Sequence, residues 1–197
     1  ARVDAKRAGS KAGKSFTTGM VGALSGALAS LGGAQLLGDF LADAEEAQKI
    51  GRLTAQVVKT TGGAANVTAG QVAKLAEAIS NKAGVDDEAI QSGQNLLLTF
   101  TNIRNEAGKG NDIFNRTSAA AVDMAAALND GTASAEGIAS SSKMLGKALN
   151  DPIKGVSALS RVGVSFTKQQ KEQIKTLVES GDTLGAQKVI LAEIGKE

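Results

Sequence analysis

The chain has 197 residues, a formal net charge of +2, and neither Cys nor His. These absences exclude disulfides and thiol catalysis, leave carboxylates as the only ligands for a zinc site, and remove the side chain most often used in general acid–base catalysis. All five aromatic residues are Phe, so we expect a core of Leu, Ile, Val and Ala. We expect no enzyme, no cofactor and no metal site. The length suits one domain with its own core, alone or with an extended arm.

The first 14 residues are basic. Five of them are Lys or Arg and one is Asp, among Ala, Gly and Ser, a composition typical of a solvated arm. We expect no sequence-specific contact with nucleic acid. Residues 8–15, AGSKAGKS, match a loose phosphate-loop pattern, but that loop requires a buried strand before it. The preceding ARVDAKR cannot form such a strand, so nucleotide binding is not predicted.

The next stretch, residues 15–38, carries no charge over 24 positions. Small residues recur in it at every fourth position, namely Gly22, Gly26, Ser30, Ala34 and Gly38. Such a stripe lets a second helix approach closely, so we expect this segment to pack on another helix or on copies of itself. Its length would also span a bilayer core, and insertion into a membrane is the alternative.

An amphipathic helix is predicted to follow, with Ile50, Leu53, Val57 and Val58 on its apolar face and an end at Thr61-Gly62-Gly63. Residues 15–61 are thus expected to be helical, first rich in small residues and then amphipathic. Residues 64–197 are expected to form a separate helical domain.

Within residues 64–197 the sequence marks the start of several short helices. The predicted N-caps are Thr68, Asp87 (or its neighbour Asp86), Asp151, Thr167 and Asp182. Both Thr residues have Gln three positions later, as in a capping box, and Asp151 precedes a Pro suited to the first helical position. The acidic run at 86–88 is ordinary chemistry for a first helical turn, and we do not interpret it as a metal site.

The centre of the core is predicted in a helix that starts near residue 87 and contains the apolar run 96–100 and Ile103. A further helix is expected over residues 112–129, with Leu128 on its apolar face. No segment alternates apolar and polar residues over a strand's length. The predicted fold is therefore all-α: a long N-terminal helix or helix pair, followed by a compact domain of short capped helices.

An ordered series of short motifs resembles the tape measure proteins of long-tailed bacteriophages and prophages. The resemblance covers roughly residues 45–197. Its motifs, in chain order, are Thr61-Gly62-Gly63, Leu75–Ile79, Asp87-Glu88-Ala89-Ile90, Leu96–Asn105, Leu145–Asn150, Asp151-Pro152, Lys154-Gly155, Ala158-Leu159-Ser160, Gly163-Val164-Ser165-Phe166-Thr167, Gly181-Asp182, Ala186-Gln187 and Ile190-Leu191.

The resemblance implies a structural protein of the phage tail that takes part in tail-length determination, tail assembly and genome delivery. It implies the tail tube, the tail tip and tail assembly chaperones as partners, and the virion as the location, with host cytoplasm during assembly. Because such chains are long and this one begins with Ala1, we expect an internal piece of a longer protein. The alternative function is a membrane-active helical protein that inserts through residues 15–38 during genome ejection.

Overall fold

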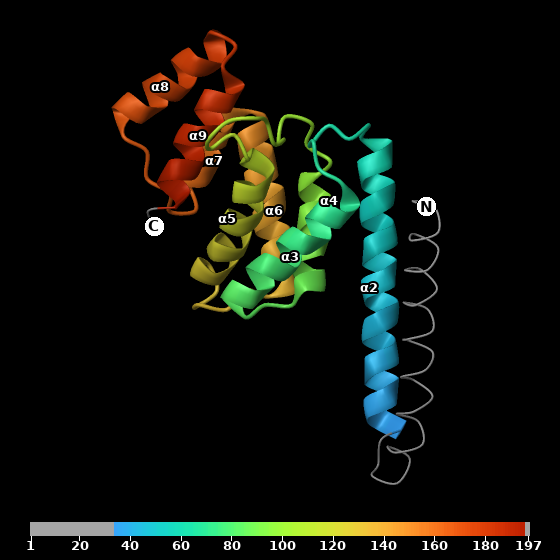
Figure 1. Cartoon of the computed structure of the whole chain (residues 1–197). Helices are drawn as coiled ribbons and strands as arrows, with labels where there is room; N and C mark the ends of the chain where they lie inside the picture. Colours follow the sequence, from blue (N-terminus) through green and yellow to red (C-terminus); the bar gives the residue numbers. More distant parts are fainter. Residues whose placement is uncertain (1–33, 196–197) are drawn as a thin grey trace, which may run out of the picture. The chain divides into compact units, whose positions relative to one another are not determined.

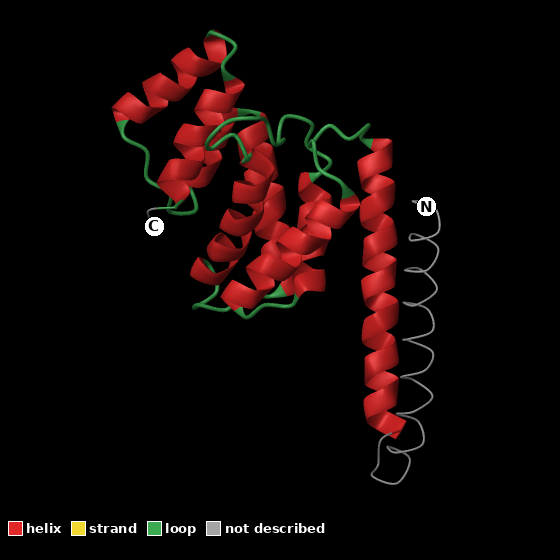
Figure 2. Ribbon diagram, in the orientation of Figure 1, coloured by secondary structure: helices red, strands yellow, loops and turns green. Residues whose placement is uncertain are grey.

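The computed structural model describes residues 34–195, and their side chains from residue 44 onward. It is all-helical in this part, which confirms the predicted fold class (Figure 2). The eight helices described are α2 (Ala34–Thr60), α3 (Ala69–Ala83), α4 (Asp87–Leu97), α5 (Ile113–Ala127), α6 (Ala135–Asn150), α7 (Pro152–Ser160), α8 (Lys168–Glu179) and α9 (Thr183–Ile194) (Figure 1). One of the two compact units of the chain comprises Ala47–Glu197 and includes the last turns of α2.

Side-chain caps explain where most of the short helices begin. Thr68 and Thr167 each accept a hydrogen bond from the backbone of the third helical residue, whose Gln side chain bonds back, so both capping boxes form. Asp151 accepts from Lys154 N at the start of α7, and Asp182 accepts from Gly185 N at the start of α9. Because these bonds satisfy donors that the first turn leaves free, the chain restarts a helix after each break.

The cap of α4 is Asp86 and not Asp87. The Oδ1 atom of Asp86 accepts from Glu88 N at 2.9 Å, and Asp87 is the first helical residue. Asp86 has the extended ψ of a cap, whereas Asp87 already lies inside the first turn, where its charge favours the helix dipole. Two adjacent Asp residues look alike in sequence, and only the backbone conformation distinguishes them.

Helix α6 occupies the centre of the helical domain and packs against α4, α5 and α7 (Figure 1). The core is aliphatic, as expected, and Phe114 is its one fully buried aromatic residue among those described. The largest buried cluster takes residues from the α2–α3 loop through α9. A smaller one joins α3, α4, α5 and α6 through Ala76, Ile79, Ile90, Val122, Ala125 and Ile138.

The helix predicted through Ile103 ends earlier, at Leu97. Three successive turns follow, in which the Thr99, Phe100 and Ile103 amides each bond to the carbonyl three residues back. The Thr99 hydroxyl also donates to Leu96 O at 2.7 Å, so the side chain competes for a helical acceptor. The turns bring both Leu98 and Ile103 into the core, at 1% and 0% exposure.

Three predicted core residues are exposed. Leu53 is 50% exposed, Leu96 is 38% exposed and Leu128 is 53% exposed. Among the α2 side chains described, the buried positions are Ile50 and Thr54, and Thr54 is one residue after Leu53. Leu128 lies after the last turn of α5, where its backbone only caps the helix.

Candidate functional site

The predicted small-residue stripe falls mostly outside the described residues. Gly22, Gly26 and Ser30 lie there, as do the basic arm and the phosphate-loop pattern. Ala34 is the first residue of α2, and Gly38 lies within that helix. The predicted interface of this stripe therefore stays a prediction.

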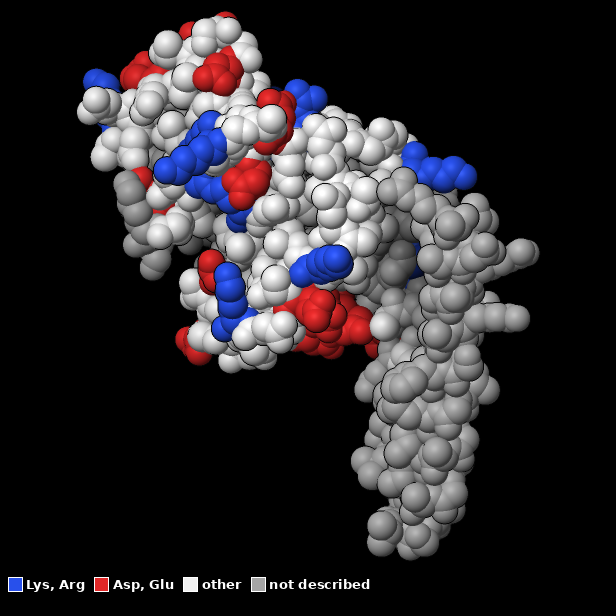
Figure 3. All heavy atoms as spheres, viewed as in Figure 1, with Lys and Arg blue, Asp and Glu red and all other residues white. Residues whose placement is uncertain are grey.

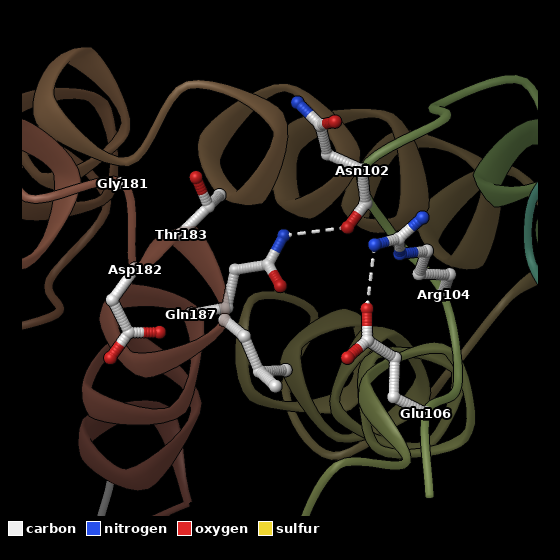
Figure 4. Close-up of a pocket in the computed structure, with 8 residues that line it drawn as sticks. Asn102, Arg104, Glu106, Gly181, Asp182, Thr183 and Gln187 are labelled. Atoms are coloured by element: carbon white, nitrogen blue, oxygen red, sulfur yellow. Dashed lines mark hydrogen bonds and ion pairs between the residues drawn. The ribbon is translucent and has the colours of Figure 1, made fainter.

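A polar pocket of about 420 Å³ lies among the described residues. It lies where the loop after α4 meets the start of α9 (Figure 4). Asn102, Arg104 and Glu106 come from the loop, and Asp182, Thr183 and Gln187 from the first turns of α9. The sequence marks Asp182 as a helix cap, but no pattern in it indicates that these two segments meet.

Gln187 holds the two sides of this pocket together. It is 2% exposed, and its Nε2 donates to Asn102 O at 2.8 Å and to Leu149 O at 3.0 Å. One amide thus joins α9 to the loop and to the end of α6. A Gln on a mostly apolar helix offered no sequence signal for this role, because its acceptors are backbone carbonyls 85 and 38 positions away.

The charged groups of the pocket are one guanidinium and two carboxylates. Arg104 Nη2 lies 2.7 Å from Glu106 Oε1, with both side chains partly exposed to solvent. Asp182 is engaged at the start of α9, and Asn105 pairs with Asp112 to close the loop on itself. Because Arg104 is already paired and Asp182 adds a second negative charge, the pocket suits a polar protein surface better than a free anion.

A second hollow, of about 290 Å³, is mainly apolar. It lies between the end of α5, the loop after α7 and the end of α9, and is lined by Met124, Ala127, Leu128, Val162, Val164 and Ile194, with Gly163 and Asp123. The exposed Leu128 side chain belongs to this lining. This hollow, which we call the apolar groove, thus accounts for the exposed position of Leu128, one of the large apolar residues that face solvent.

An acidic group gathers at the start of α4 (Figure 3). One carboxylate oxygen from each of Asp86, Asp87 and Glu88 lies within 4.8 Å of the others. A hydrogen bond with Asp86 is the main cause that raises the pKa of Glu88 to about 7, and the same bond lowers the pKa of Asp86. The pair therefore shares a proton near neutral pH, which competes with cation binding because a protonated carboxyl is a poor ligand.

Among residues 34–195, no helix is long and apolar enough to cross a membrane. The predicted alternative segment, residues 15–38, lies largely outside that range.

Comparison with known proteins found no matching family model, no matching curated protein and no matching solved structure.

Proposed function

We propose that this chain is a segment of a phage tail tape measure protein and serves tail-length determination, tail assembly and genome delivery. The observation that carries the proposal is the ordered series of motifs between residues 45 and 197. The series extends over most of the chain. A single short motif would carry far less weight than such a series.

The positions of these motifs in the fold support the proposal. Asp151-Pro152 starts α7, Thr167 caps α8, and Gly181-Asp182 separates α8 from α9. Gly181 has a φ of +84°, a conformation that Gly adopts without strain. Part of the resemblance therefore falls on residues that define helix ends, where the identity of the residue has a physical consequence.

The physical basis of a ruler is the constant rise of an α-helix, about 1.5 Å per residue. α2 is a continuous helix of 27 residues, long enough for about 40 Å by that rise. The short helices α3–α9 form a packed domain, in which residue count does not convert into length. We therefore assign the ruler role to the helical part that precedes residue 61, and a docking role to the packed domain.

The proposal places the chain in the virion tail, with tube and tip proteins and assembly chaperones as partners. The polar pocket and the apolar groove are the hollows of the packed domain to which such proteins would bind.

The test is to purify tails from the phage or induced lysogen that encodes this chain and to digest them for mass spectrometry. We expect peptides from residues 45–197 in intact tails, and none in heads purified from the same lysate. Tails of normal form that lack these peptides would overturn the proposal.

A membrane-active role is the second candidate, and the uncharged stretch 15–38 favours it. Its test is flotation of the 197-residue chain with phosphatidylcholine–phosphatidylglycerol vesicles, beside a Leu24→Asp/Leu28→Asp variant. Insertion predicts that the wild-type chain floats and the variant does not, because a charge in a bilayer core is costly. A wild-type chain that stays with the soluble fraction would exclude this candidate.

A further inference from the structure

Helix α2 meets the helical domain through a narrow face. From residue 47 to residue 60, Ile50 and Thr54 are buried, and Val57 and Val58 are partly buried against the core. The positions between them are mostly exposed, including Leu53. This face has two buried residues, whereas α5 and α6 bury eight and seven residues, so it contributes less to the stability of the domain.

The partner face on α4 carries amide side chains where a helix interface usually carries apolar ones. Gln91 is 7% exposed, and its Nε2 donates to Thr54 Oγ1 at 2.8 Å. Asn95 follows one helical turn later on the same side, 6% exposed, and Gln94 lies beside it at 1%. We call Gln91, Gln94 and Asn95 the amide face of α4.

Two members of the amide face have no hydrogen-bond partner. Both polar atoms of Gln94 and both of Asn95 are buried without one. A buried amide without partners costs free energy that it regains on exposure to water. Opening this interface therefore hydrates Asn95 and its neighbours, and so costs less than the opening of an apolar interface of the same size.

The connection between α2 and α3 contains a two-glycine turn followed by an anchor, and Gly63 N bonds to Val58 O across this turn. Gly62 and Gly63 both have positive φ, +64° and +69°, and a Cβ on either would meet no atom within 4 Å. Beyond them, Ala65 is 2% exposed, and its carbonyl accepts from Asn105 N at 3.0 Å. Asn66 Nδ2 donates to Asn105 O at 2.9 Å. The chain is thus fastened to the domain from Ala65 onward.

We propose that residues 47–60 of α2 form a detachable arm, which leaves α4 by rotation about Gly62-Gly63 while α3–α9 remain folded. The narrow contact face, the unpartnered amides and the two-glycine turn before a fixed anchor carry this inference together. It does not depend on the proposed function. In its released state the amide face of α4 becomes open to water.

Hydrogen exchange on the unmodified 197-residue chain tests the arm, because a helix that has lost its packing partner frays and so exposes its amides. We expect the backbone amides of residues 54–58 to exchange about tenfold or more faster than those of residues 117–121 in α5. The α2 rate should also respond little to low denaturant, because local opening exposes little surface. Equal rates with equal denaturant dependence at the two sites would overturn the proposal.

A matched pair of thiol probes gives a second readout, since the chain contains no other Cys. Thr54 and Thr117 are both 0% exposed, and each hydroxyl donates to the carbonyl four residues back. Because Thr54 also accepts from Gln91, both probes are placed in a Gln91→Leu background, in which neither change leaves that donor unpaired. There, Thr54→Cys should react with a thiol reagent faster than Thr117→Cys under native conditions. Labelling of both variants at the rate of global unfolding would contradict the proposal of a detachable arm.

Substitutions in the amide face test whether its unpartnered amides are what loosens the arm. Asn95→Leu removes two unpartnered atoms and should slow exchange at residues 54–58 by about tenfold relative to residues 117–121. Gln91→Leu is the control, because Gln91 already has a partner in Thr54, and it should not slow exchange there. If Asn95→Leu leaves α2 exchange unchanged or faster, the amide face does not loosen the arm.

Discussion

The ring of Phe100 lies directly on the backbone of Gly146, so that a Cβ added to Gly146 would come within 2.2 Å of Phe100 Cε2. Gly146 is in the middle of α6, and Phe100 is in the turns after α4. The ring of Phe100 therefore fills the space that a side chain at position 146 would occupy.

Gly146→Ala should destabilise the domain by roughly 1–3 kcal/mol, although Ala is the better helix former by about 1 kcal/mol. The measurement is the free energy of unfolding from urea denaturation. Phe100→Ala frees the space, so Gly146→Ala in that background should lose its penalty. Gly70→Ala, at a site in α3 with no atom within 4 Å of the new Cβ, is the control for helix propensity alone and should stabilise the domain by up to about 1 kcal/mol. A penalty that persists without the Phe100 ring would show that another contact is responsible.

Gly155→Ala should lower the free energy of unfolding by more than Gly146→Ala does. A Cβ on Gly155 would lie 2.2 Å from Ala148 O and 2.5 Å from Ala148 Cα. These are backbone atoms and cannot rotate away as a Phe ring can, so α6 and α7 must separate. We expect a loss of about 3 kcal/mol, measured in the same denaturation series. A smaller loss than that of Gly146→Ala would contradict the close α6–α7 contact.

Leu97→Ala should lower the free energy of unfolding by roughly 2–5 kcal/mol, because Leu97 is 0% exposed in the principal cluster and the substitution leaves a cavity. Leu96→Ala is the matched control, one residue away and 38% exposed, and it should cost much less. Similar urea midpoints for the two variants would show that α4 is rotated from the orientation described.

The Asp86–Glu88 pair should make stability depend on pH near neutrality. The folded-state pKa of Glu88 is raised from 4.5 to about 7, so the folded protein holds this proton more tightly than the unfolded chain does. This contribution is full below pH 4.5 and is lost as the pH rises through 7. Asp86 acts in the opposite sense, since its lowered pKa gives a contribution that is lost only in acid.

Urea denaturation between pH 5 and pH 8 measures this effect. The wild-type chain should take up a fraction of a proton on folding. The Glu88→Gln variant should take up none at this site, because its new side-chain amide donates to Asp86 at every pH. Parallel stability curves for the two proteins would mean that Glu88 titrates normally.

Helix ends were predictable where one side chain determines them. The Thr-x-x-Gln pairs at 68 and 167 specify two hydrogen bonds each, and both form. The end of α4 was not predictable from its apolar run, because an apolar run fits a helix or buried turns equally well. The turn at Thr99 depends on the burial of both Leu98 and Ile103, which is a tertiary effect.

The contacts of the candidate sites were the least predictable feature. Gln187 bonds to two backbone carbonyls, and carbonyls carry no sequence identity. Thr54 took the buried position expected for Leu53, because Gln91 supplies a hydrogen-bond donor there. Such pairings require knowledge of which helices are neighbours.

If the chain is a segment of a tape measure protein, as proposed, tail length in the phage whose genome carries its gene tests that claim most directly. A tandem duplication of residues 34–51 adds 18 residues, or five helical turns, so residues 47–60 keep their phase and their contacts. If α2 contributes to a ruler, one extra copy should lengthen the mean tail by about 27 Å and two by about 54 Å, as measured by electron microscopy. Normal tails of unchanged mean length in both variants would contradict the tape measure assignment.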